Sequence, residues 1–115
     1  MQILKRQYIR SRKLMKAYSL IGCTVEDCGK GPTCGAHSNW AIHGKGSKIK
    51  ADDNRCASMC YTHHHELDQG RHWSEQDRRA IWWDAHVRTV MALVDVGAWP
   101  ADVPVPDLTW PKEWA

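Results

Sequence analysis

The chain has 115 residues and a formal net charge of +3, and 43% of its residues are hydrophobic. We expect a single domain spanning 1–115, and a domain this small buries so little of its surface that an additional stabilising element such as a metal ion is expected. No apolar run is long enough for a signal-peptide core or a membrane span. The sequence therefore predicts a cytoplasmic protein with no membrane role.

Positive charge is concentrated in residues 1–22, which we interpret as a basic, helical N-terminal arm. Six basic residues precede the first acidic residue: Lys5, Arg6, Arg10, Arg12, Lys13 and Lys16. The apolar pattern predicts a helix over at least residues 12–20. Such an arm suits a phosphate backbone, with Arg10, Arg12 and Lys13 as candidate contacts, but basic runs are also common on solvated helix faces.

The segment 23–70 is predicted to form the core of the domain. Residues 23–46 are rich in Gly, Cys, Thr and Ser, which favours knuckles, turns and short strands. The apolar stretch 56–59 then leads into a helical turn that ends near Gly70. The expected order is strand, loop, strand, helix.

A long helix is predicted over 74–97, from a Ser74 cap to Gly97. It carries two apolar stripes and so needs two partners: the core, and either the N-terminal helix, the tail or a second copy in a homodimer. Four prolines in the tail 98–115 exclude a regular helix there and favour an extended strap anchored by tryptophans. The fold class is therefore predicted to be α+β.

Five cysteines interleaved with histidines indicate metal ligation in a reducing compartment. Two close pairs, Cys23 with Cys28 and Cys60 with His63, supply the four soft ligands of a closed tetrahedral zinc site. If Cys56 lies on one strand with Cys60, the two are roughly 13 Å apart, too far to share a metal ion, and we expect it to be buried. Cys34 is expected to be a free thiol, with replacement of Cys28 as the alternative.

A second set of residues lies between these pairs in the sequence and directly after them. It comprises Ala36-His37-Ser38-Asn39, His43-Gly44-Lys45-Gly46, Asp52-Asp53-Asn54, and the pair His64 and Asp68. The pair is spaced i, i+4, so that on a helix both side chains share one face and could hold one cation. A solvent-exposed helical pair is the plainer interpretation.

The order of these elements resembles the zinc-containing branch of the HNH, or ββα-metal, endonucleases. More narrowly, Ser11-Arg12-Lys13, Ala36-His37-Ser38-Asn39-Trp40, Gly44-Lys45-Gly46, Lys50-Ala51-Asp52-Asp53 and Glu66-Leu67-Asp68-Gln69-Gly70 resemble small phage and prophage nucleases of the YbcO type. The resemblance covers roughly residues 11–98. It implies a zinc-stapled ββα core and cleavage of DNA phosphodiesters, in phage recombination or DNA processing inside a bacterial host, with a recombinase as one conceivable partner.

The resemblance also implies roles for individual residues. His37 would be the general base, and Asn54 or Asp53 would orient it. His64, with Asp68, would hold a catalytic Mg²⁺ or Mn²⁺, and Lys45 would approach phosphate. Some HNH enzymes place a metal ligand just before the base, where this chain has Ala36, so the alternative is a non-catalytic zinc module that binds nucleic acid or protein.

Overall fold

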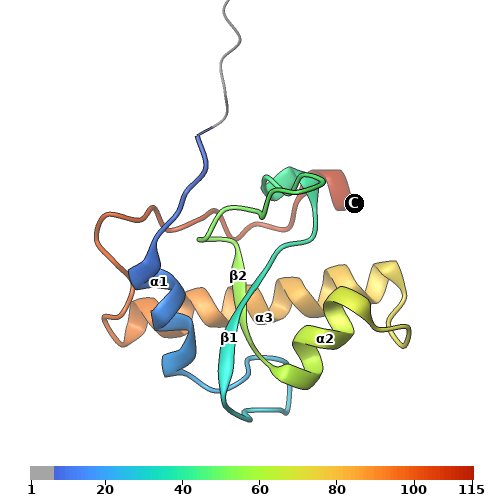
Figure 1. Cartoon of the computed structure of the whole chain (residues 1–115), viewed down its shortest axis with the longest axis horizontal. Coiled ribbons are helices and arrows are strands. Elements are labelled where there is room, and N and C mark those ends of the chain that lie inside the picture. The colour runs from blue at the N-terminus through green and yellow to red at the C-terminus, as the bar shows by residue number, and fades with distance from the viewer. Residues whose placement is uncertain (1–6) are drawn as a thin grey trace, which may run out of the picture.

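The computed structural model describes residues 7–115, so the part of the predicted basic arm that contains Lys5 and Arg6 lies outside the described residues. Within them the protein is an α+β fold with three α-helices, one two-stranded sheet and three short 3-10 helices. The elements in chain order are α1 (Arg12–Ala17), η1 (Tyr18–Leu20), β1 (Thr33–His37), η2 (Ala41–His43), β2 (Cys56–Cys60), α2 (Tyr61–Gln69), α3 (Glu75–Asp95) and η3 (Lys112–Trp114). The predicted order of strand, loop, strand and helix is confirmed (Figure 1).

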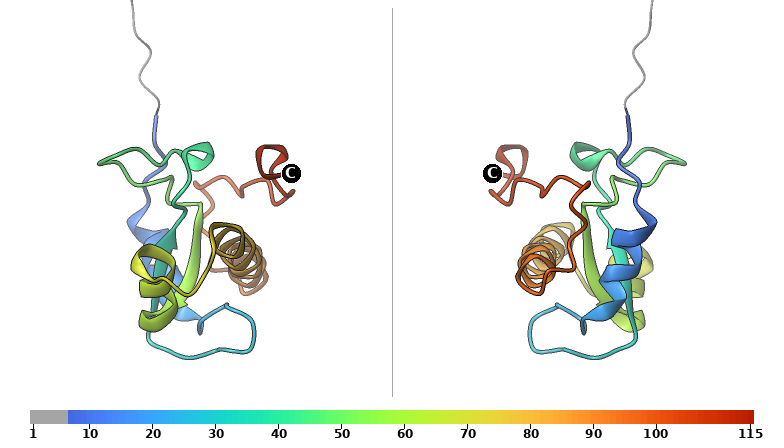
Figure 2. Two further views of the ribbon diagram at one scale, coloured as in Figure 1. Left: turned by 90° about the vertical axis from the view of Figure 1, so that its right-hand side faces the viewer. Right: turned by 90° about the vertical axis from the view of Figure 1, so that its left-hand side faces the viewer.

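The sheet is the centre of the molecule. β1 and β2 pair antiparallel, with Thr33 opposite Cys60 and His37 opposite Cys56. Helix α3 covers one face of the sheet, and α1 and α2 lie on the other (Figure 2). All five residues of β2 are buried between these layers. The antiparallel register therefore places the end of β1 beside the loop that precedes β2.

The N-terminal helical segment docks through a small apolar face. Ser11 caps α1 by accepting a hydrogen bond from the Leu14 amide at 3.1 Å. Leu14 and Tyr18 are fully buried. Gly35 of β1 allows this packing, because a Cβ there would lie 2.6 Å from the Tyr18 ring. Helix α1 and η1 together confirm the helical prediction for residues 12–20.

The long helix α3 begins where the sequence predicts. The Ser74 side chain accepts from the Asp77 amide at 3.1 Å. Trp82 is fully buried and donates its indole N–H to the Ala36 carbonyl of β1 at 3.0 Å. Because a buried carbonyl needs a partner, this bond fixes the backbone immediately before His37.

The C-terminal tail supplies one of the partners predicted for α3. The Trp114 ring lies 5.9 Å from Trp83 of α3 and 5.0 Å from Trp40. The tail is largely extended, as predicted, but ends in the short 3-10 helix η3. The apolar surface of α3 is not fully covered, since Val94 remains 47% exposed. No helix within residues 7–115 combines the length and apolar character needed to cross a lipid bilayer.

Candidate metal centre and adjoining pocket

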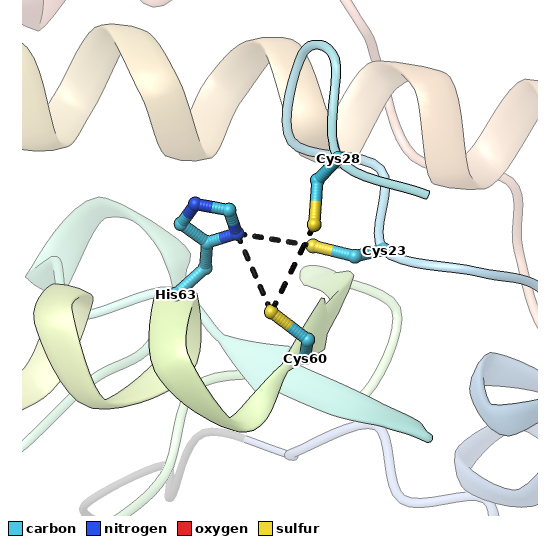
Figure 3. Close-up of side chains that lie close together, drawn as sticks. All are labelled: Cys23, Cys28, Cys60 and His63. Carbon is cyan, nitrogen blue, oxygen red and sulfur yellow. Dashed lines mark hydrogen bonds between the residues drawn. The ribbon is translucent and has the colours of Figure 1, made fainter. Parts of the chain in front are cut away.

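Four predicted ligands converge at one point of the fold. The side chains of Cys23, Cys28, Cys60 and His63 bring their ligand atoms within 4.8 Å of one another, a group that could hold a metal ion (Figure 3). Two come from the loop before β1 and two from the junction of β2 and α2. The loop closes on itself, since the Cys23 amide donates to the Lys30 carbonyl at 2.9 Å. The predicted ligand set is thus assembled by segments far apart in the sequence.

The distances in this group fit tetrahedral coordination. The Nδ1 atom of His63 lies 3.4 Å from both Cys23 Sγ and Cys60 Sγ, and Cys28 Sγ lies 4.0 Å from Cys60 Sγ. Two sulfurs each about 2.3 Å from a tetrahedral zinc ion are about 3.8 Å apart, and a sulfur and a nitrogen are about 3.6 Å apart. Three thiols and one imidazole in this arrangement are consistent with a structural zinc ion.

Protonation of these thiols is governed by their surroundings. Burial raises the pKa of the Cys23 thiol to about 11. The pKa of Cys28 is lowered, chiefly by the hydrogen bond that its sulfur receives from the Lys30 backbone. Because a metal ion binds the thiolate, occupation of the site displaces the Cys23 proton.

The other two cysteines lie outside the group. Cys56 is fully buried, as the sequence predicts, and burial raises its pKa. Cys34 is exposed on β1, where its sulfur lies 3.2 Å from Nδ1 of His64. The alternative in which Cys34 replaces Cys28 as a ligand is therefore wrong, because the group contains Cys28 and not Cys34.

A second centre lies beside the metal group. His37, Asn39, Lys45, Lys50, His64 and Asp68 line one pocket together with Met15, Gly35 and Ser38. It lies where the end of β1 faces α2. The fold therefore brings the predicted base and the predicted cation pair to the same place, together with two lysines.

His37 is held by one of its two predicted partners. Its Nε2–H donates to Asp53 Oδ1 at 2.9 Å, so that Nδ1 is the nitrogen left to act as a base. The Asn54 amide instead donates to the carbonyl of Pro104 in the tail at 3.0 Å. Of the two residues named for the orienting role, Asp53 contacts the ring and Asn54 anchors the tail.

Asp53 is in turn fixed by the N-terminal arm. Its Oδ2 accepts from the Ser11 amide at 2.7 Å, and its carbonyl accepts from the Tyr18 hydroxyl at 2.6 Å. Burial raises the pKa of Tyr18, which keeps that hydroxyl a donor. The carboxylate that orients His37 is thereby connected to residues more than thirty positions earlier in the chain.

His64 and Asp68 form the predicted pair on α2. The Nε2–H of His64 donates to Asp68 Oδ2 at 3.1 Å, which leaves Nδ1 to accept from the Cys34 thiol. Asn39 donates to the other carboxylate oxygen at 3.0 Å. Burial opposes ionisation of Asp68, but the hydrogen bonds from His64 and Asn39 outweigh it and lower the pKa of the carboxyl. Sequence spacing indicated the pair, but not that Asn39 contacts Asp68 or that Cys34 contacts His64.

The four residues predicted to bind nucleic acid differ in what they contact. Arg12 and Lys13 are exposed on α1. The Arg10 guanidinium donates to the carbonyls of Ala51 at 2.7 Å and Lys50 at 2.8 Å, so it fastens the arm to the loop before β2. Lys45 lines the pocket, with its ammonium 3.0 Å from the Gly46 carbonyl.

His43 belongs to the second set of residues named from the sequence, but it does not line the pocket of His37. It is 5% exposed and packs in the tryptophan cluster, where its Nδ1 lies 2.6 Å from the Ser38 hydroxyl. A phosphate contact is excluded by that burial.

Comparison with known proteins finds no family model, no curated protein and no solved structure that matches this chain. The interpretation of the site therefore depends on its own geometry and on the residue pattern.

Proposed function

We propose that the protein is a metal-dependent endonuclease of the HNH type that hydrolyses DNA phosphodiester bonds. One observation carries the proposal: His37, oriented by Asp53, opens into the same pocket as the i, i+4 pair His64 and Asp68. A general base close to an imidazole and a carboxylate that could hold a cation is a combination that supports metal-dependent phosphodiester hydrolysis. The resemblance of the residue pattern to HNH nucleases supports the choice of DNA as substrate.

In this proposal each group has a separate task. Cys23, Cys28, Cys60 and His63 would hold a zinc ion, which would fix the β2–α2 junction and with it the position of His64. His37 Nδ1 takes the proton from the attacking water, while Asp53 holds the ring and stabilises its protonated form.

Two further groups handle the phosphate. Lys45 and Lys50 lie on the pocket wall and attract the phosphate backbone. When bound by His64 and Asp68, Mg²⁺ or Mn²⁺ supplies electrostatic stabilisation of the charge that develops on the phosphate and on the departing oxygen.

The alternative is a non-catalytic zinc-stabilised module that binds nucleic acid or protein. The specific observation in its favour is Ala36, which occupies the position before His37 and is fully buried. It cannot ligate a cation, and among residues 7–115 the only group with three or more convergent metal-ligating side chains is the one formed by the three cysteines and His63.

The experiment that decides between the two is cleavage of plasmid and single-stranded DNA by zinc-loaded protein with added Mg²⁺ or Mn²⁺. His64→Ala and Asp68→Asn variants test the cation pair, provided that zinc content and circular dichroism match the wild type. We expect the wild type to cut and both variants to lose cleavage while still binding DNA. Wild-type protein that binds DNA but does not cut either substrate with either cation would favour the binding module.

A further inference from the structure

An exposed aromatic side chain lies beside the candidate cation pair. Tyr61 is the first residue of α2 and is 81% exposed, the highest value among the large hydrophobic side chains of the described residues. Its ring stacks on His65 one helical turn later, with centroids 6.0 Å apart and an interplanar angle of 17°. Most of the tyrosine ring therefore faces solvent in a defined orientation, although no core contact requires an aromatic residue there.

This aromatic pair adjoins the proposed active centre. Tyr61, His64, His65, Asp68 and Gln69 line one hollow, and His64 and Asp68 also belong to the pocket of His37. Lys45 and Lys50 also line the pocket of His37. The candidate cation pair thus borders two hollows, one that contains the two lysines and one that contains the aromatic pair.

We propose that the Tyr61–His65 surface binds an unpaired DNA base next to the scissile phosphate, so that the substrate is DNA that is single-stranded at the point of cleavage. The inference rests on the proposed nuclease function and adds the substrate class. The lysines bind the backbone phosphate in the pocket of His37, and the adjacent base stacks on Tyr61 in the neighbouring hollow.

Stacking of a base on a protein side chain requires a base with an open face. In a duplex both faces of each base are covered by its neighbours, so an aromatic ring on the protein surface has nothing to stack on unless a base leaves the helix. In a single strand each base has a free face, and stacking on an aromatic side chain makes a sizeable contribution to binding for any base. Charged side chains alone would favour the duplex, because its two strands give it a higher density of phosphate charge.

The test uses full-length, zinc-loaded protein and separates binding from cleavage. Binding of a fluorescein-labelled single-stranded oligonucleotide and of the matching duplex is measured by anisotropy without added Mg²⁺ or Mn²⁺. The variants are Tyr61→Ala and Tyr61→Phe, of which the second keeps the ring and serves as the matched control. Both substitutions are at an exposed position, and zinc content and melting temperature verify that the fold is retained.

We expect single strands to bind more tightly than the duplex, Tyr61→Ala to weaken single-strand binding about tenfold, and Tyr61→Phe to change it less than twofold. A set of oligonucleotides is also tested, each lacking the base at a different position. At one position we expect the missing base to weaken binding by the wild type but to leave binding by Tyr61→Ala unchanged. Equal binding of Tyr61→Ala and wild type, or an equal loss for the duplex, would overturn the inference.

Cleavage of the same oligonucleotides with Mn²⁺ distinguishes the two proposals. If the protein cuts duplex but not single-stranded DNA, the nuclease proposal holds and the inference fails. If it cuts nothing but shows the expected Tyr61 dependence of binding, the nuclease proposal fails and the aromatic surface remains a single-strand binding site.

Discussion

Removal of one ligand from the metal group should unfold the domain. Cys60→Ala takes away the sulfur at the β2–α2 junction, which lies 3.4 Å from His63 and 4.0 Å from Cys28. Structural zinc in small domains contributes about 10–16 kcal/mol of apparent binding free energy at neutral pH. That is as large as the whole stability of a typical domain, about 5–15 kcal/mol, and here the sheet has only two five-residue strands.

The assay for this prediction combines zinc content by mass spectrometry with thermal unfolding followed by circular dichroism. We expect one zinc ion per wild-type chain, and for Cys60→Ala much less bound zinc and no cooperative transition at neutral pH. His63→Cys should keep both zinc and fold, because thiolate and imidazole are interchangeable in tetrahedral zinc sites.

Cys34→Ala is the matched control, since this thiol is exposed and outside the group. It should retain one zinc ion and a cooperative transition. A Cys60→Ala protein that melts like the wild type, or a wild-type protein that stays folded without zinc in strong chelator, would refute the reasoning.

Three further predictions follow from individual contacts. Asp53→Asn should slow DNA cleavage by more than tenfold, because the ring of His37 loses the carboxylate that orients it. Asn54→Ala should leave the cleavage rate within about twofold and mainly loosen the tail. A kinetic assay in which Asn54→Ala is the slower variant would exchange the two roles. His86 is fully buried, and burial lowers its pKa to about 3, so the unfolded state takes up a proton that the folded state does not as the pH falls below about 6.5. Between pH 6.5 and 3 this group should lower the free energy of unfolding by up to about 1.4 kcal/mol per pH unit. Urea unfolding at a series of pH values should therefore show a steeper loss of stability for the wild type than for His86→Gln, and parallel curves would contradict this prediction. Thr89→Val should lower the free energy of unfolding in urea by about 1–3 kcal/mol, because the buried Ser58 amide of β2 loses the Thr89 hydroxyl that accepts its hydrogen bond at 2.9 Å. A loss under about 0.5 kcal/mol would show that the amide finds another partner.

Local pattern predicted much of the framework. The spacing of the two cysteine and histidine pairs gave the four residues that converge on one point. Ser74 with Asp77 marked the start of α3, and the i, i+4 spacing of His64 and Asp68 placed them on one helical face. Such features depend on residues within a few positions of one another, for which sequence spacing is informative.

Contacts between distant segments could not be read in the same way. The sequence left Asp53 and Asn54 as equal candidates, because neighbouring residues in a loop can point in opposite directions. Their roles follow from partners about 15 to 50 residues away: His37 and the arm for Asp53, and the tail for Asn54. Arg10 was predicted as a phosphate contact from its charge, and that role stays a prediction. Nothing in the sequence indicated that its guanidinium donates to backbone carbonyls about forty positions later.

In the proposed function, His37 acts as the base at a centre distinct from the zinc site. Single-turnover cleavage of a single-stranded oligonucleotide and of its duplex, with Mn²⁺ titrated into zinc-loaded wild type and zinc-loaded His37→Ala, measures this. We predict saturable Mn²⁺-dependent cutting by the wild type and a rate about 100-fold or more lower for the variant at equal zinc content and equal DNA binding. Equal rates for the two proteins, or no Mn²⁺-dependent cutting of either substrate by the wild type, would contradict the proposed function.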